Sequence, residues 1–204
     1  MPQIRFVIFD MDEVLYDYDH AKRLGLLEKL TGRPASEIDT AVWGGPEESR
    51  AEAGSPATPE GYLAQYAQLL GYPIDFDTWA DIRRQMMRPR PDVLDLVRRL
   101  GKKTDLALLT NNGMLLKPAL PVCAPEAAAI FGEKAHVSAE FRARKPDPVI
   151  YHRICAKYGY DPAETAFVDD RKANVEGAEL AGLTGHVYTS RNELLRFLEV
   201  HGLV

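Results

Sequence analysis

Short apolar runs recur along this chain and constrain its fold more than any other feature. In the clearest cases, aspartate or threonine follows the run at once. The predicted buried strands cover residues 4–9, 105–109 and 165–168, with weaker candidates at 136–139 and 185–188. Apolar positions at helical spacing lie between and after them, in residues 93–100, 150–158 and 194–198. Strands that alternate with helices favour a parallel sheet covered on both faces. We therefore predict an α/β fold with a doubly wound, Rossmann-like parallel sheet.

One stretch interrupts this alternation, because residues 16–88 show helical patterns throughout and offer no strand. Two helix starts are expected there, at Ser36 and at Thr58, where a side chain able to cap the helix precedes acidic residues. Tyr62 and Tyr66 share one helix face and are expected in the core of this module. We predict a small all-helical cap at residues 16–88, inserted into a catalytic core formed by residues 1–15 and 89–204.

The composition excludes several classes of protein. A chain of 204 residues with 46% hydrophobic content can bury one good core but not two large independent ones. No apolar run is long enough to span a bilayer and we expect no secretion signal, which together predict a cytoplasmic protein without membrane contact. Cys123 and Cys155 lack the spacing of a zinc site or a disulfide framework. The formal net charge of −5 argues against nucleic-acid binding, and a small molecule is the expected partner.

Polar side chains stand where the predicted strands end. They are Asp10 and Asp12 after the first strand, Thr110 and Asn111 after the second, Asp169 and Asp170 after the strand at 165–168, and Lys145 just before a predicted helix. In an open α/β sheet, ligands bind outside the carboxyl ends of the strands. We therefore expect these side chains to form one site.

Four motifs at these positions give the chain a specific resemblance. They are Val7-Ile8-Phe9-Asp10-Met11-Asp12-Glu13-Val14-Leu15, Leu108-Leu109-Thr110-Asn111, Lys145-Pro146-Asp147, and Phe167-Val168-Asp169-Asp170 followed by Asn174 and Gly177. Taken in order, they resemble the motifs of the haloacid dehalogenase superfamily, over roughly residues 4–15 and 90–190. The resemblance implies a hydrolase of the phosphatase branch, with a small helical cap inserted after the first strand.

The resemblance also implies a role for each matched residue. Asp10 would be the nucleophile and Asp12 the general acid and base. Thr110, Asn111 and Lys145 would bind the phosphoryl group, and Thr110 and Lys145 would count among the catalytic residues. The implied metal ligands are Asp10, Asp12 through its backbone carbonyl, Asp169 and Asp170.

Electrostatics supports a metal independently of the resemblance. Four aspartates against the single ammonium of Lys145 leave three net negative charges in one crevice, which would repel a phosphate dianion. A cation must offset this charge, and an all-oxygen, carboxylate-rich site suits magnesium. We therefore predict Mg²⁺ as the cofactor.

Several other residues have plainer interpretations. Asp147, before Pro148, is expected to cap a helix, and Asn174 to support the site without binding the metal. The histidines show no metal-site spacing and are expected at the surface or in packing; they are His20, His136, His152, His186 and His201. Solvated or ion-paired side chains are expected for Arg50, Arg83, Arg84 and Arg88; the alternative is that one of them faces the site.

Two features are left open by the sequence. Residues 43–46, Trp-Gly-Gly-Pro, would either touch substrate or anchor the helical module. Glu13 stands where many relatives have glycine, and it would lie outside the crevice or support the metal from a distance.

The predicted function is magnesium-dependent hydrolysis of a small phosphate monoester, a sugar phosphate or a nucleotide, through a phosphoaspartate. A sugar-phosphate mutase shares the same motifs, and only product analysis separates it. A haloacid dehalogenase needs neither magnesium nor a second acid, so Asp12 argues against it. A non-catalytic binding module would have lost Asp10 or Lys145, and both are present. The substrate and the oligomeric state do not follow from the sequence.

Overall fold

A five-stranded parallel sheet lies at the centre of the molecule in the computed structural model, which describes residues 3–204. Its strands are β1 (Phe6–Phe9), β4 (Asp105–Thr110), β5 (Ala135–Val137), β6 (Thr165–Asp169) and β7 (Thr184–Val187). All five predicted strands are confirmed, with ends that differ by at most two residues. The strand order is β5-β4-β1-β6-β7, so the chain winds outward from β1 first to one edge and then to the other. This is the predicted doubly wound topology, and it places the switch in direction at β1.

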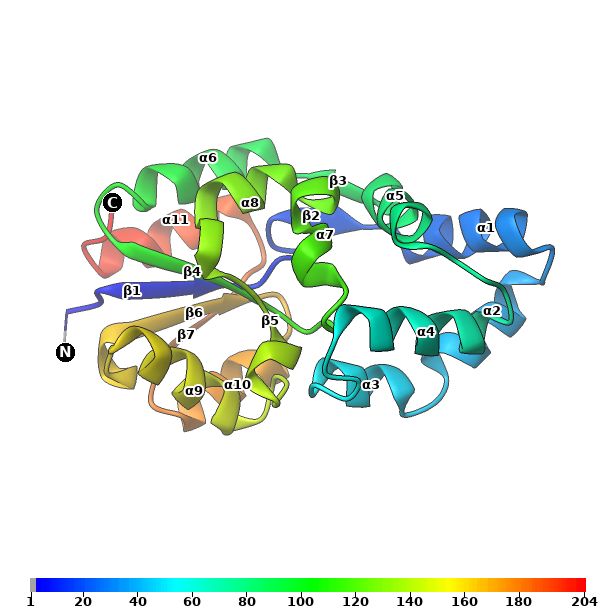
Figure 1. Cartoon of the computed structure of the whole chain (residues 1–204). Helices are drawn as coiled ribbons and strands as arrows, with labels where there is room; N and C mark the ends of the chain where they lie inside the picture. The colour runs from blue at the N-terminus through cyan, green and yellow to red at the C-terminus, as the bar shows by residue number, and fades with distance from the viewer. Residues whose placement is uncertain (1–2) are drawn as a thin grey trace.

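Helices cover both faces of the sheet (Figure 1). One face carries α6 (Pro91–Leu100), α7 (Leu116–Cys123), α8 (Pro125–Phe131) and α11 (Arg191–Val200); the other carries α9 (Pro148–Tyr158) and α10 (Lys172–Leu180). Short 3₁₀ turns occupy Gly132–Lys134, Ser138–Phe141 and Pro162–Glu164. Alternate residues of β1 serve the two cores, because Val7 and Phe9 pack on the first face and Phe6 and Ile8 on the second. A side chain of this size contributes about 1.5–3 kcal/mol when fully buried.

A helical insertion, residues 19–86, follows the first strand. Its helices are α1 (His20–Thr31), α2 (Ala35–Trp43), α3 (Glu47–Glu52), α4 (Pro59–Leu70) and α5 (Phe76–Met86). Figure 1 shows it beyond the carboxyl ends of the sheet strands. Thr58 caps α4 as predicted, since its hydroxyl accepts from the backbone N–H of Gly61 at 3.1 Å. Tyr62 and Tyr66 are buried, also as predicted.

The predicted cap at Ser36 is wrong. Helix α2 begins one residue earlier, at Ala35, and no side chain caps it. Pro34, with φ fixed at −56°, precedes the first turn and sets its backbone direction without a capping hydrogen bond.

The prediction that residues 16–88 contain no strand is also wrong. β2 (Tyr16–Tyr18) pairs antiparallel with β3 (Met87–Pro89) as the chain leaves the core and returns to it. Each strand has three residues and its partner lies about 70 positions away, so no local pattern indicates the pair. The buried Tyr16 ties this ribbon to α8, because its hydroxyl donates to Glu126 and accepts from the backbone N–H of Ala127.

Within residues 3–204, none of the helices has the length and apolar character needed to cross a bilayer.

Candidate active site

The three central strands bring their polar ends together at one edge of the sheet. β1 is followed by Asp10, β4 ends at Thr110 and β6 ends at Asp169, and β1 pairs with both of the other strands. A cavity of about 220 Å³ opens there. It is lined by Asp10, Asp12, Glu13, Tyr18, Glu52, Thr110, Asn111, Lys145, Asp170, Arg171 and Asn174. Of the residues singled out from the sequence for this site, all but Asp169 line the cavity, and Asp169 lies buried directly beneath it.

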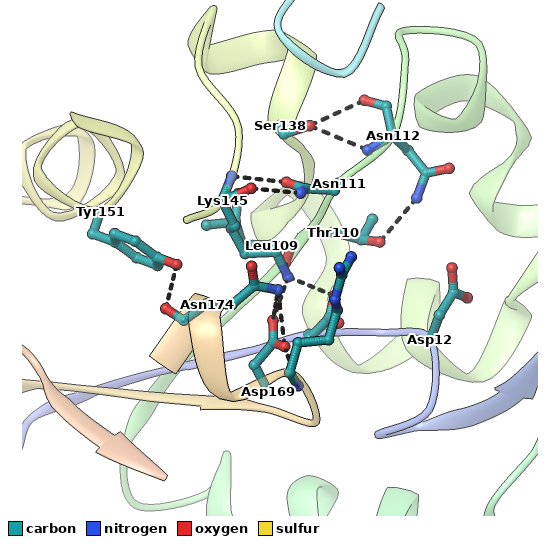
Figure 2. Close-up of polar contacts among 12 residues, drawn as sticks. Asp12, Leu109, Thr110, Asn111, Asn112, Ser138, Lys145, Tyr151, Asp169 and Asn174 are labelled. Atoms are coloured by element: carbon teal, nitrogen blue, oxygen red, sulfur yellow. Dashed lines mark hydrogen bonds and ion pairs between the residues drawn. The ribbon is translucent and has the colours of Figure 1, made fainter. Parts of the chain in front are cut away.

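Lys145 contacts two of the aspartates, and Figure 2 shows its side chain extending toward Asp169. Its Nζ lies 2.8 Å from Asp10 Oδ1 and 2.7 Å from Asp169 Oδ2, and it also donates to the Leu109 carbonyl at 2.9 Å. Only 1% of the residue is exposed. Burial opposes its charge, but the two carboxylates outweigh burial and raise the pKa of Lys145 above its usual value. The side chain is therefore a buried ammonium whose three protons all have acceptors.

Asp10 resists ionisation in this setting despite its contact with Lys145. Desolvation raises the pKa of the Asp10 carboxyl to about 8, with Lys145 acting in the opposite direction and Asp169 and Asp12 adding to the rise. The pKa of Asp170 is also raised, first by burial and then by Asp169. The cluster holds more negative charge than Lys145 can offset.

Three carboxylates form a candidate metal centre. Asp10, Asp169 and Asp170 each offer an oxygen, and these oxygens all lie within 4.8 Å of one another. Asp169 is completely buried, and its Oδ1 accepts from the backbone N–H of Arg171 at 2.8 Å. Asn174 donates to both oxygens of Asp169 at 3.0 Å, which agrees with the supporting role expected for it.

The end of β4 is held in place by two amide side chains and two hydroxyls (Figure 2). Asn111 accepts from the backbone N–H of Lys145 and donates to its carbonyl, both at 2.9 Å. Asn112 donates to the Thr110 hydroxyl at 2.9 Å, and Ser138 binds the backbone of Asn112. Both polar atoms of the Asn111 side chain are thus engaged with the backbone of Lys145.

Asp12 stands on the side of the cavity that faces the helical insertion. Its Oδ2 accepts from Arg83 Nη2 at 2.7 Å, while its Oδ1 is buried without a hydrogen-bond partner. Arg83 belongs to α5 and is 2% exposed. Arg83 is therefore ion-paired rather than solvated, and because its partner lines the cavity, it is the arginine that the alternative interpretation placed at the site.

Glu13 fastens the turn after β1 to the ribbon of β2 and β3. Its φ is 61°, in the left-handed region that favours glycine. Its carboxylate accepts from the backbone N–H of Tyr18 at 2.9 Å and from Arg90 at 2.8 Å, and Arg90 also donates to Asp17 at 2.7 Å. These bonds hold a backbone conformation that costs a non-glycine residue about 1–2 kcal/mol. The role that the sequence left open is therefore a structural one at the cavity wall.

Sequence reasoning did not identify three further residues at the cavity. Tyr18 comes from β2, Glu52 from α3 and Arg171 from the turn before α10. Burial raises the pKa of Glu52 to about 7, although Arg144 lies 2.6 Å away and opposes the rise. None of the three belongs to a motif, and only the placement of the insertion over the sheet could have indicated Tyr18 and Glu52.

Residues with predicted structural roles behave as expected. Asp147 caps α9, accepting from the backbone N–H of Val149 at 2.9 Å. His136 is a buried packing residue, with contacts to Glu140 and Tyr158. Trp43 packs edge-on against Tyr66, so the anchoring role considered for it is observed.

A family model decides the classification. The model described as haloacid dehalogenase-like hydrolase matches residues 4–182, which include every motif residue of the site. The chain belongs to the haloacid dehalogenase-like hydrolase family. It is therefore an enzyme of the hydrolase class, as its motifs imply.

Relatives of this hydrolase agree with that assignment. It is 25% identical to human N-acylneuraminate-9-phosphatase over 228 residues, covering 96% of this chain and 86% of the relative. It is 28% identical to a protein named as a phosphatase from Mycobacterium tuberculosis, over 90% of this chain and 87% of that one. A family enzyme of Bacteroides thetaiotaomicron, solved with magnesium and inorganic phosphate, superposes with a TM-score of 0.74 at 21% identity, covering 92% and 96% of the two chains. The last comparison shows the shared fold.

Proposed function

We propose that this haloacid dehalogenase-like hydrolase is a magnesium-dependent phosphatase that acts on a small phosphate monoester through a phosphorylated Asp10. One observation carries the proposal. Asp10, which has the position of a nucleophile, is also a member of the oxygen cluster with Asp169 and Asp170, and it shares its cavity with Asp12. The proposed nucleophile, the proposed cation site and the proposed acid/base therefore adjoin the same cavity. The two relatives named as phosphatases support the same chemistry.

The residues present fit a hard divalent cation. The cluster is made only of carboxylate oxygens, and the raised pKa values of Asp10 and Asp170 show that it lacks positive charge. Asp10, Asp170 and the backbone carbonyl of Asp12 would hold Mg²⁺, with Asp169 contributing directly or through water. When bound, the ion would neutralise the carboxylates and draw a phosphate oxygen toward Asp10.

The first chemical step would form an acyl phosphate. An Asp10 oxygen attacks phosphorus, the bond from phosphorus to the ester oxygen breaks, and Asp12 gives its proton to the departing alkoxide. Lys145 offsets charge on the phosphoryl oxygens through its buried ammonium, and the Thr110 hydroxyl with neighbouring backbone N–H groups completes the cradle.

The second step would return the enzyme to its starting state. Asp12, now a carboxylate, takes a proton from water as the water oxygen attacks phosphorus. The bond between phosphorus and the Asp10 oxygen breaks, which releases inorganic phosphate and regenerates both carboxyl groups. The helical insertion, with the β2–β3 ribbon that joins it to the core, would act as a cap, formed by residues 16–88, that keeps bulk water from this intermediate.

The shape of the cavity and the name of one relative bear on the substrate. The cavity is open on one side, so an alcohol larger than this space can extend out of it. The name of the human relative, N-acylneuraminate-9-phosphatase, favours a sugar phosphate. We therefore propose a sugar phosphate or similar polyol phosphate as the substrate class.

A phosphate-release screen tests the proposal. Purified protein would be incubated with a panel of sugar, polyol and nucleoside monophosphates, with Mg²⁺ and with excess chelator, beside Asp10→Asn as the matched inactive variant. We expect release from polyol or sugar phosphates, only with metal and only in the unaltered enzyme. Product analysis separates hydrolysis from a shift of phosphate within one sugar, and chloride release from 2-chloropropionate detects dehalogenation. Full activity in chelator would contradict the proposal.

A further inference from the structure

We infer that Arg83, on α5 of the helical insertion, is a positioning residue for Asp12: it holds one carboxylate oxygen and so directs the other at the leaving group. This inference rests on the proposed function, because it assigns Asp12 its role as acid and base. It adds a residue from outside the four motifs to the catalytic apparatus.

The two oxygens of Asp12 have different surroundings. Oδ2 lies 2.7 Å from Arg83 Nη2, whereas Oδ1 is buried and has no hydrogen-bond partner. Asp12 lines the cavity that also contains Asp10. A free, buried oxygen beside the nucleophile is placed to exchange a proton with the departing alcohol and then with water.

An aspartate in this position needs an external restraint. The last torsion of an aspartate side chain, χ2, has a broad profile, so the carboxylate rotates readily unless something holds it. A misplacement of about 1 Å in a reacting group can reduce the rate about 100-fold. The bond from Arg83 fixes the carboxylate plane, and it does so from the insertion rather than from the sheet.

The surroundings of Arg83 indicate that its guanidinium serves to bind Asp12. Across residues 3–204, Asp12 supplies the only carboxylate oxygen within 4.0 Å of the Arg83 guanidinium. The Tyr18 ring covers the guanidinium at 4.7 Å, and Arg83 Nε is buried without a partner. The nearby Glu48 is already engaged, since the Tyr62 hydroxyl donates to it at 2.9 Å.

This pattern differs from that of an arginine retained only for packing. Burying a cation costs several kcal/mol unless it is well paired and hydrogen-bonded. Arg23, a second buried arginine in the insertion, lies 4.5 Å from the Trp43 ring and 5.7 Å from the Tyr66 ring, and it donates to the Tyr18 hydroxyl at 3.0 Å. Arg83 instead forms an ion pair with a carboxylate in the turn after β1, which links the position of the insertion to the orientation of the acid/base.

The test compares leaving groups of matched shape. Phenyl phosphate and 4-nitrophenyl phosphate differ mainly in the basicity of the phenolate, so only the former strongly needs a proton from Asp12. The variants are Arg83→Met, Arg83→Lys and, as the control, Arg84→Met. Arg84 is the next residue on α5, but its side chain is exposed and pairs with Asp81 at 2.7 Å. Release of the alcohol would be followed in a single turnover with Mg²⁺.

We expect Arg83→Met to slow the release of phenol from phenyl phosphate at least about tenfold more than the release of nitrophenol from 4-nitrophenyl phosphate. Arg83→Lys should recover part of the difference, and Arg84→Met should match the unaltered enzyme. In an Asp12→Asn background, Arg83→Met should have little further effect, because both changes remove the same proton transfer.

Equal losses for the two esters in Arg83→Met would overturn the inference and leave Arg83 a packing residue. If Arg83→Met does not fold, as judged by its melting temperature, the ratio between the two esters in Arg83→Lys decides the question in the same way. An unaltered enzyme that releases no phosphate from any ester would overturn the proposed function itself, which is a separate result.

Discussion

Acidification should weaken Mg²⁺ binding, because the metal has to displace a proton from Asp10. Burial raises the pKa of Asp10 from an ordinary value of 3.8 to about 8, even though Lys145 opposes the rise. Below that pH the metal-free carboxyl is mostly protonated, whereas a metal ligand must be ionised. The raised pKa of Asp170 acts in the same direction.

The size of the effect follows from the shift. If Asp10 alone titrates, the apparent affinity for Mg²⁺ falls about tenfold for each pH unit below 8, so it is about 100-fold weaker at pH 6. That change corresponds to about 2.7 kcal/mol of binding free energy. Above pH 8 the affinity should level off. Stability without metal has the opposite trend: the folded state retains a proton that the unfolded state loses, so stability falls as pH rises from about 4 to about 8.

Calorimetric titration with Mg²⁺ measures the affinity and the number of protons released on binding. Titrations at several pH values, each in two buffers of different ionisation enthalpy, give the affinity and the number of protons released. We expect about one proton per Mg²⁺ near pH 6.5 and close to none above pH 9. Asp10→Asn should bind more weakly with little pH dependence, and Asp95→Asn, a surface control on α6, should behave as the unaltered protein.

An affinity that is equal at pH 6 and pH 8.5, with no proton released, would refute this reasoning. It would mean that Lys145 keeps Asp10 ionised throughout and that contact with the ammonium outweighs desolvation.

Three further substitutions test the site. Asp10→Asn should reduce hydrolysis of 4-nitrophenyl phosphate by about 10⁴-fold or more, measured with saturating Mg²⁺, since it removes the nucleophile. Asp170→Asn should weaken Mg²⁺ about tenfold or more while the metal-free melting temperature holds or rises, because one charge leaves a repelling cluster; a large drop in that temperature would indicate a structural role instead. Lys145→Met should lower the unfolding free energy in urea without metal by about 3–5 kcal/mol, because it removes the buried ammonium that pairs with Asp10 and Asp169. A stability equal to that of the unaltered protein would show that one of them simply takes up a proton at no cost.

The sheet and the strand-end residues followed from the sequence because the signals are local. A buried strand is a short apolar run, and residues after parallel neighbouring strands must meet at the same edge. The sequence therefore predicts that Asp10, Thr110 and Asp169 lie close together. The Lys145-Pro146-Asp147 motif adds Lys145 to the predicted site. The same logic anticipated the supporting contact of Asn174, one helical turn after Asp170.

What the sequence did not indicate depends on distant pairing. Arg83 and Asp12 are 71 positions apart, so no local pattern predicts their ion pair, although the spacing from Trp79 and Met86 places Arg83 on the buried face of α5. The positive φ of Glu13 is set by Arg90 and Tyr18, which reach it only once β2 and β3 have paired. Contacts between the insertion and the core cannot be predicted from hydrophobic periodicity or from motifs, because both are local patterns.

The β2–β3 ribbon makes the insertion a separable part for protein engineering. Tyr18 and Met87 are direct partners across the ribbon, so a two-residue hairpin turn could join them in place of everything between. The parallel pairings of β1 with β4 and β6 involve no residue of the removed segment. The shortened protein would expose apolar surface of α7, which packs against α4 and α5, and would need polar replacements there to stay monomeric. Grafting a foreign insertion at the same two residues would exchange Glu52 and Arg83 near the cavity, while the carboxylates and Lys145 would keep their places in the core.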